Sequence, residues 1–510
     1  RLGSSDAPLP HSLSGVHRAA LSSQLSLRQS VGWLFIGNTG NQLLTFAFGL
    51  VLARLLTPED FGLIVTIQVF TGLAGFVSGG GMGQALGRAQ ETKKADFDIV
   101  FTLQLMIGVA IYLFFFTLAP WMSDWYNDAR YTDLLRVSAI TFLSRPFVNL
   151  PGCIMHREMR FKEGTLVRLA ALLISSAVSI GMAANGYGVW SLVVGGLAGS
   201  VVNMVLLARY ARWRPGFSLD FARGRELARY GFLVSLNDVV VYVRFQTTNF
   251  ILGRTLGMGA VGLFNKADSL VKTPHSFIAG SVYHVLFRAL AKAHDDTRRS
   301  IELFMQSQRL VAVYATPCYV FLFWLAEPLI SVLYGDRWAD AAAPLAMLAI
   351  SGPLVTIENL SGAVYAARNW LGRELGVQVL MVVLVAGASL AGLQYGLAGI
   401  SALLIGVTLY NAIHMYSLAA RCLGTGWVDL LRALAPAAIL NTILAGSLWL
   451  FDLLLAHHGH VQPLVRLLLL GCGGSLVYIA AFLILPIATL ETERSRWKEK
   501  LGLKRASTGP

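Results

Sequence analysis

Seven of the charged side chains that fall within long apolar stretches of the sequence have the clearest capacity for chemistry. Four are basic (Arg145, Arg244, Lys266 and Lys272) and three are acidic (Asp238, Asp268 and Glu358). An ionisable group inside a membrane span is costly, so it normally faces a partner or an aqueous cavity. We therefore predict a cationic, hydrated cavity in which the four basic residues bind a negatively charged ligand. The three acidic residues are candidates for coupling a cation or a proton.

Intramembrane pairing is the alternative interpretation of the same residues. Asp268 and Lys272 are four positions apart, which allows an ion pair on one helix face, and Asp238 can compensate Arg244. Lys272 can also extend its ammonium group toward the membrane surface. The sequence leaves open which of these charges face a cavity.

The segments that carry these charges are typical of membrane helices. Hydrophobic residues make up 55% of the 510-residue chain and charged residues 14%, with a mean hydropathy of +0.60, whereas soluble domains average about 25% charged residues. Apolar stretches long enough to cross a bilayer recur along the whole chain. We predict an all-α polytopic membrane protein with about 14 transmembrane helices.

The basic residues are distributed unevenly between the connecting segments. If the N-terminus is cytoplasmic, 31 of the 41 lysines and arginines fall on the cytoplasmic side and five on the opposite side. Positive charge concentrates on the cytoplasmic side of membrane proteins, so both termini are predicted to be cytoplasmic. This distribution explains the net charge of +13 by membrane topology and argues against nucleic-acid binding.

An internal repeat divides the chain. The segment LARLLTPEDFGL (Leu52–Leu63) returns as LGRTLGMGAVGL (Leu252–Leu263), and two further matches follow in order at offsets of 208 and 210 residues. Chance similarity of apolar residues explains one such match more easily than three. Six predicted helices separate the equivalent positions, which indicates two parallel lobes around a central cavity. The predicted organisation is a cytoplasmic N-terminal extension (1–30), an N-lobe of six helices (31–208), a cytoplasmic inter-lobe linker (209–230), a C-lobe of six helices (231–420), two C-terminal helices (434–488) and a cytoplasmic tail (489–510).

Signatures of enzymes and metal proteins are missing from the sequence. It has no phosphate-binding G-x-x-x-x-G-K-[ST] motif and no H-E-x-x-H motif,. The four cysteines have no paired spacing,. We predict a transporter with no catalytic residues, no cofactor and no metal site, driven by an ion gradient, the membrane potential or the gradient of its cargo.

Several motifs together resemble the polysaccharide-transport branch of the multidrug/oligosaccharidyl-lipid/polysaccharide exporter superfamily, the Wzx-type flippases. They are GLVLARLLTPEDFGL, MHREMRFK (Met155–Lys162), RWRPGFSLD (Arg212–Asp220), ILGRTLGMGAVGLFNKADSL (Ile251–Leu270), VLFRALAKAHDD (Val285–Asp296) and YGDRWADAAAPLAMLA (Tyr334–Ala349). The resemblance implies a flippase that moves an undecaprenyl-diphosphate-linked oligosaccharide from the cytoplasmic to the periplasmic leaflet of the bacterial inner membrane. It also implies membrane lipids, a polysaccharide polymerase and chain-length proteins as partners.

Three rival functions remain. A peptidoglycan lipid II flippase shares the fold, and a cation-coupled small-molecule exporter belongs to the same superfamily, although such exporters usually have twelve helices. A membrane-embedded glycosyltransferase or polymerase would need a long extracytoplasmic loop with acidic residues, and no predicted outer loop is long enough.

Overall fold

The computed structural model describes residues 37–79, 82, 86, 93–293, 295–368, 371–457 and 461–502. For 221–237 and 371–375 it describes only the backbone. In this part of the chain every regular element is a helix. The predicted N-terminal extension and the final residues of the predicted tail lie outside the described residues.

The chain forms two compact units. The first comprises the chain up to Leu55 together with Phe70–Leu236, and the second comprises Leu56–Val69 together with Asn237–Pro510. Two helices, α2 (Pro58–Gly79) and α9 (Phe221–Thr255), therefore belong partly to each unit. The helix α9 begins inside the segment that was expected to be a linker (209–230).

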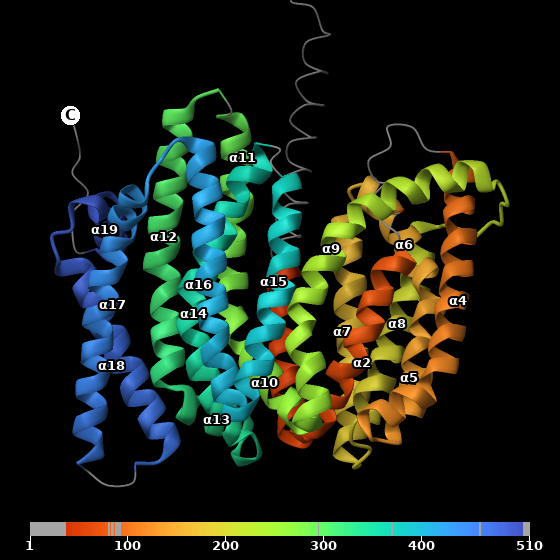
Figure 1. Ribbon diagram of the computed structural model, residues 1–510, viewed down its shortest axis with the longest axis horizontal. Coiled ribbons are helices and arrows are strands. Elements are labelled where there is room, and N and C mark those ends of the chain that lie inside the picture. Colours follow the sequence, from red (N-terminus) through yellow and green to blue (C-terminus); the bar gives the residue numbers. More distant parts are fainter. Residues whose placement is uncertain are drawn as a thin grey trace, which may run out of the picture. The chain divides into compact units, whose positions relative to one another are not determined.

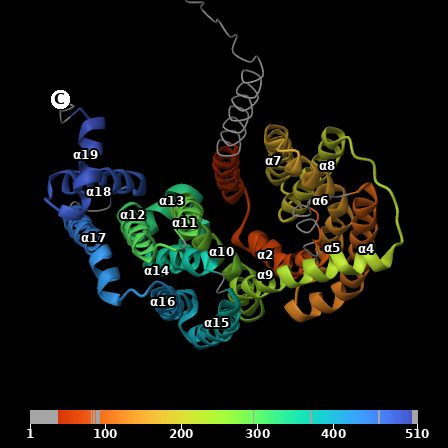
Figure 2. The same ribbon diagram turned by 90° about the horizontal axis from the view of Figure 1, so that it is seen from above.

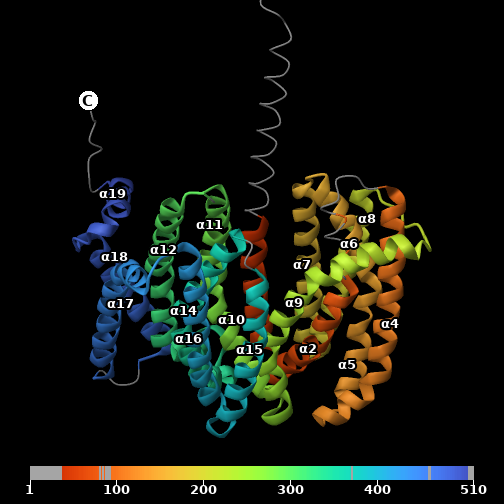
Figure 3. The ribbon, with the colours of Figure 1, turned by 45° about the horizontal axis from the view of Figure 1, so that its top comes forward.

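The first unit is built from long helices joined by short turns (Figure 1). After a helix that ends at residue 55, it contains α4 (Lys94–Tyr126), α5 (Arg130–Ala139), α6 (Thr141–Arg157), α7 (Phe161–Ala184) and α8 (Trp190–Ala211). Small residues let α7 and α8 pack closely side by side (Figure 3). A Cβ on Gly199 would lie 2.9 Å from the Ser175 Cβ, the kind of close approach that small residues permit between membrane helices.

The second unit holds the remaining elements. They are α10 (Gly257–Pro274), a π-helical turn η1 (His275–Ala279), α11 (Gly280–Lys292), α12 (Thr297–Trp324), α13 (Ala326–Tyr334), a 3-10 turn η2 (Asp336–Ala341), α14 (Ala342–Ala367), α15 (Leu371–Gly392), η3 (Leu393–Tyr395), α16 (Gly396–Leu423), α17 (Trp427–Ala456), α18 (Pro463–Ile484), η4 (Ala488–Leu490) and α19 (Glu491–Lys500).

The last two long helices lie at the edge of the second unit, where α17 packs on α12 and α18 on α13 (Figure 2). A three-residue ion network joins these elements. The Arg466 guanidinium of α18 lies 2.9 Å from the Asp452 carboxylate of α17 and 3.3 Å from the Glu327 carboxylate of α13. These helices are thus fixed to the unit by charge pairing as well as by apolar packing.

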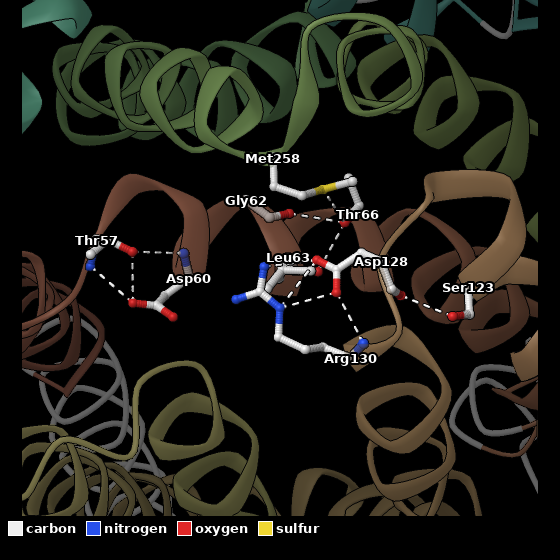
Figure 4. Close-up of polar contacts among 9 residues, drawn as sticks. All are labelled: Thr57, Asp60, Gly62, Leu63, Thr66, Ser123, Asp128, Arg130 and Met258. Carbon is white, nitrogen blue, oxygen red and sulfur yellow. Dashed lines mark hydrogen bonds and ion pairs between the residues drawn. The ribbon is translucent and has the colours of Figure 1, made fainter.

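The start of α2 crosses α10 within the second unit. Thr57 and Asp60 cap α2, because the Thr57 hydroxyl donates to the Asp60 carboxylate at 2.8 Å and accepts from the Asp60 N–H at 3.2 Å (Figure 4),. At the crossing, a Cβ on Gly62 would overlap the Met258 carbonyl, and a Cβ on Gly262 would overlap the Pro58 carbonyl. Both helices therefore need glycine at their point of contact.

This crossing is reciprocal. Position 62 meets position 258, and position 262 meets position 58, so exchanging each residue for its equivalent 200 positions away (62 for 262, and 258 for 58) turns one contact into the other. Two copies of one motif related by a twofold axis make contacts of this kind. The structure thus brings together the two segments that the sequence comparison aligned at an offset of 200 residues.

A charged turn joins α4 to α5 in the first unit. Burial raises the pKa of Asp128, but hydrogen bonds from the side chain and backbone of Arg130 lower this pKa by more. The pKa of Asp128 therefore lies below the usual range of an aspartate. Arg130 Nη2 lies 2.8 Å from the Asp128 carboxylate, and the Ser123 hydroxyl donates to the Asp128 carbonyl (Figure 4). The turn is thus held by an ionised aspartate.

Many of the helices meet the requirements for crossing a membrane. Within the described ranges, eight helical segments are long and apolar enough, and a ninth qualifies if α12 and α13, bent by 80°, form one span. The polytopic, all-helical fold predicted from the sequence is confirmed, and the predicted number of about 14 spans stays a prediction.

Candidate functional site

A cavity of about 530 Å³ lies inside the second unit, among α9, α10, α12, α14, α15 and α16. Its walls combine apolar side chains with charged and neutral polar ones. The charged residues are Arg244, Asp268, Lys272 and Glu358, and the polar ones include Thr248, His275, Ser276, Ser351, Asn359, Thr408 and Asn411. A largely apolar cavity with a few converging polar groups is the usual form of a ligand site.

Local structure positions two of these polar groups. The α-helical path of α10 ends at Pro274, and the following π-helical turn carries His275 and Ser276 on the cavity wall. Proline removes a backbone donor and disturbs the helix around it, and isolated π-helical turns are frequent at functional sites. The wide turn thus places two polar side chains on the cavity wall.

Arg244 and Glu358 form an ion pair between α9 and α14 at the cavity. The guanidinium Nη1 lies 3.3 Å from Glu358 Oε1, and the two side chains are 12% and 17% exposed. Because both groups are largely removed from solvent, each depends on the other for charge compensation. The sequence placed both residues in membrane spans, and the partner considered for Arg244 in the alternative interpretation was Asp238.

Lys272 pairs with Asp268 one helical turn earlier on α10, as the spacing suggested. Lys272 Nζ also lies 4.9 Å from the centre of the Phe245 ring, and the Arg244 guanidinium lies 4.6 Å from the same ring. Phe245 therefore contacts both cavity cations, an arrangement in which an aromatic face partly replaces their hydration.

The charges on the cavity wall balance. Among the described lining residues, the cations Arg244 and Lys272 each have a carboxylate partner. The sequence predicted a cationic cavity lined by four basic residues, whereas two of them, Arg244 and Lys272, are among the described lining residues and each has an acidic partner. A negatively charged ligand would have to compete with Glu358 or Asp268 for these cations.

The cavity also contains uncharged polar groups that the sequence did not mark as site residues. Asn359 Oδ1, Asn411 Oδ1, His275 Nδ1 and the Tyr319 hydroxyl are buried without a hydrogen-bond partner among the described residues. A buried polar atom without a partner costs about 1–3 kcal/mol, so a ligand rich in hydroxyl groups would gain by satisfying them. One signal was present, because Asn411 matches Asn203 in the internal repeat.

Lys266 lies outside the lining of this cavity. Its ammonium group is enclosed by three rings within the second unit, at 4.2 Å from the Phe61 centroid, 5.1 Å from Tyr334 and 5.5 Å from Trp338. Phe61 and Trp338 also meet edge to face at 5.4 Å. This aromatic cluster joins the start of α2, α10 and η2 through one cation.

We expect Lys266→Met to lower stability without weakening ligand binding in the cavity. Methionine keeps the length and apolar stem but loses the cation–π contacts, which are worth about 2 kcal/mol or more when desolvated. Thermal unfolding in detergent should show the loss, and Lys266→Arg should recover most of it. An unchanged unfolding temperature together with a raised KM for cargo would instead place Lys266 in the transport path.

Arg145 belongs to the first unit and is not among the residues that line the cavity. Its Nη1 donates to the Gly75 carbonyl at 2.8 Å and to the Ser78 hydroxyl at 3.2 Å, and its guanidinium lies 5.0 Å from the Phe142 ring. A Cβ on Gly75 would lie 2.7 Å from Arg145 Nη2, so glycine makes room for the guanidinium. Asp238, on α9, is exposed and is not among the cavity-lining residues.

Comparison with known proteins decides the family. Residues 51–343 match the family described as polysaccharide biosynthesis protein. The chain belongs to this family. The family predicted from the sequence motifs is therefore confirmed.

Three named proteins of polysaccharide biosynthesis are similar to this chain over about two thirds of its length. The succinoglycan biosynthesis transport protein ExoT of Rhizobium meliloti is 25% identical, over 65% of this chain and 67% of ExoT. The lipopolysaccharide biosynthesis protein WzxC of Escherichia coli is 22% identical, over 72% and 75%. The teichuronic acid biosynthesis protein TuaB of Bacillus subtilis is 23% identical, over 64% and 68%.

Solved structures with the same fold are membrane transporters. The lipid II flippase MurJ in an inward closed conformation aligns with a TM-score of 0.74 and 14% identity, over 92% of this chain and 99% of MurJ. An inward-facing multidrug resistance MATE family transporter of the MOP superfamily aligns with a TM-score of 0.61 and 17% identity, over 75% and 94%. At these identities the alignments establish the fold of this family member.

Proposed function

We propose that this multi-pass membrane protein is a flippase that translocates an undecaprenyl-diphosphate-linked oligosaccharide repeat unit for exopolysaccharide or surface polysaccharide biosynthesis. The proposed direction is from the cytoplasmic to the periplasmic leaflet of a bacterial inner membrane, by alternating access and without covalent chemistry. Both termini are proposed to be cytoplasmic, which the distribution of basic residues supports. A polysaccharide polymerase and chain-length proteins are proposed partners.

The cavity of the second unit is the observation that carries this proposal. In a chain of the polysaccharide biosynthesis family, helices suited to a membrane surround a largely apolar cavity of about 530 Å³ that carries a few charged and polar groups. The unpartnered groups of Asn359, Asn411 and Tyr319 match the hydroxyl groups of a sugar. The cations Arg244 and Lys272 match phosphate oxygens,.

The ion pairs suggest how binding and release take place. A diphosphate entering the cavity would replace Glu358 at Arg244, and Glu358 would return when the cargo leaves. The exchange keeps the arginine compensated at both stages, which limits the cost of a charge in a low-dielectric site. Glu358 and Asp268 are also the proposed sites for coupling to an ion gradient, since both line the cavity.

Reconstituted vesicles provide the test. Purified protein in proteoliposomes should accelerate the transfer of a fluorescent undecaprenyl-diphosphate oligosaccharide to the leaflet where a membrane-impermeant glycosidase can cleave it. Protein-free vesicles set the background, and vesicles loaded with lipid II test the peptidoglycan alternative. Acceleration of lipid II alone, or of neither lipid, would overturn the proposal. Repeating the measurement with an imposed sodium or proton gradient tests the coupling role.

A further inference from the structure

A second, smaller pocket of about 170 Å³ lies on α16, apart from the cavity of the proposed function. All its lining residues come from this one helix, at the three- and four-residue spacing of a single helix face. They are Tyr410, Ile413, His414, Ser417, Leu418 and Arg421. Figure 2 shows α16 at the rim of the second unit, beside α15.

The pocket is a polar stripe on a helix that is otherwise apolar enough to span a membrane. Tyr410, His414, Ser417 and Arg421 supply donors, and the lining contains no carboxylate. Arg421 is exposed, and it makes no ion pair or hydrogen bond with any residue that the structure describes. Polar groups facing the bilayer are costly without a partner, so their grouping points to a ligand with negative oxygens.

The position of the stripe suggests where the ligand comes from. Arg421 lies in the last turn of α16, and with a rise of 1.5 Å per residue the stripe extends about 16 Å from there into the span. At about 100° per residue, it lies about a third of a turn from the face that carries Leu404, Thr408 and Asn411 on the cavity wall,. The apolar stretch that contains α16 ends at Leu423, so Arg421 lies near the end of a span, where arginine side chains extend toward the membrane surface.

We propose that this stripe binds the headgroup phosphate of an anionic glycerophospholipid such as phosphatidylglycerol. The Arg421 guanidinium binds the phosphate, because its planar donors match phosphate oxygens, and His414, two turns deeper, donates to an ester oxygen of the same lipid. The Tyr410 ring lies 6.1 Å from the His414 ring. The Ser417 hydroxyl donates to the Ile413 carbonyl at 2.7 Å, which leaves its oxygen to accept from the headgroup glycerol. The exposed side chain of Ile413 lies along an acyl chain.

Native mass spectrometry of the full chain in phosphatidylcholine nanodiscs tests the proposal, with phosphatidylglycerol titrated in. We expect Arg421→Gln to weaken the tightest phosphatidylglycerol site about tenfold, the effect of losing one charge-assisted contact. His414→Leu should weaken it by a smaller factor. Arg432→Gln, which removes an exposed arginine from the neighbouring helix α17, is the matched control and should leave the site unchanged.

Three outcomes would overturn the proposal. Equal losses in Arg421→Gln and Arg432→Gln would show general attraction of an anionic lipid to a basic surface. Undecaprenyl phosphate binding in place of phosphatidylglycerol would make the stripe a cargo site. If Arg421→Gln does not fold, unchanged binding in His414→Leu decides against the site. Because binding is measured without transport, these outcomes are independent of the flippase proposal.

Discussion

Replacing Gly262 by alanine will destabilise the protein by about 2 kcal/mol, within the range seen for overpacked sites. The added methyl group would overlap the carbonyl of Pro58, where α2 crosses α10. Backbone cannot move aside as a flexible side chain can, so the helices must separate. Gly62→Ala should act in the same way through the Met258 carbonyl. Thermal unfolding in detergent, followed by circular dichroism, measures both effects.

The neighbouring Gly259 supplies the matched control. It lies on the same helix, and a Cβ there would meet no atom within 4 Å. Alanine in a helix gains about 0.5–1 kcal/mol over glycine, so Gly259→Ala should be neutral or stabilising. Because Gly62 and Gly262 act at one crossing, the double variant should lose less than the sum of the two singles. Equal unfolding temperatures for Gly259→Ala and Gly262→Ala would show that the crossing tolerates a side chain.

The repeat in the sequence predicted that crossing only in part. The match between Leu52–Leu63 and Leu252–Leu263 paired Gly62 with Gly262 as equivalent positions. It could not predict that the two glycines lie at one contact, because equivalence within a repeat does not specify contact. A symmetric contact needs an axis that passes close to both positions, and the three-dimensional structure supplies that axis.

The charged residues of the candidate site could be predicted from the sequence, but most of their pairings could not. Arg244, Lys272, Asp268 and Glu358 were identified because charges within apolar spans are conspicuous, and all four line the cavity. Their partners were less predictable. Only the pairing of Asp268 with Lys272 follows from helix spacing, whereas Arg244 and Glu358 are 114 positions apart on different helices.

Lys266 illustrates a further limit of reasoning from the sequence. A lysine in an apolar span suggested a cavity, but three aromatic rings from separate segments enclose its ammonium group. Phenylalanine, tyrosine and tryptophan are frequent in membrane helices, so no local pattern marked Phe61, Tyr334 and Trp338 as partners. The neutral cavity residues were hidden for a similar reason, since asparagine and threonine carry no charge to single them out.

Neutralising either partner of the Arg244–Glu358 pair should impair transport, but KM should rise in one case and fall in the other. Removing one member of a largely buried ion pair leaves the other uncompensated, at a cost of about 3 kcal/mol. In Arg244→Gln the cavity loses a phosphate-binding cation, so KM for the lipid-linked diphosphate should rise at least tenfold. In Glu358→Gln no carboxylate competes with the cargo for Arg244, so KM should fall. Turnover should slow, because release of the cargo loses the carboxylate that displaces it.

The double variant and a distant control make this prediction specific. Arg244→Gln combined with Glu358→Gln leaves no charge unpaired at this position, so it should unfold at a higher temperature than either single variant,. Asp238→Asn removes an exposed carboxylate from the same helix α9, outside the cavity lining, and should leave KM and turnover unchanged. Initial flipping rates against cargo concentration in proteoliposomes give KM and turnover. A rise in KM for Glu358→Gln equal to that of Arg244→Gln would contradict competition, because it would mean that the carboxylate itself assists cargo binding.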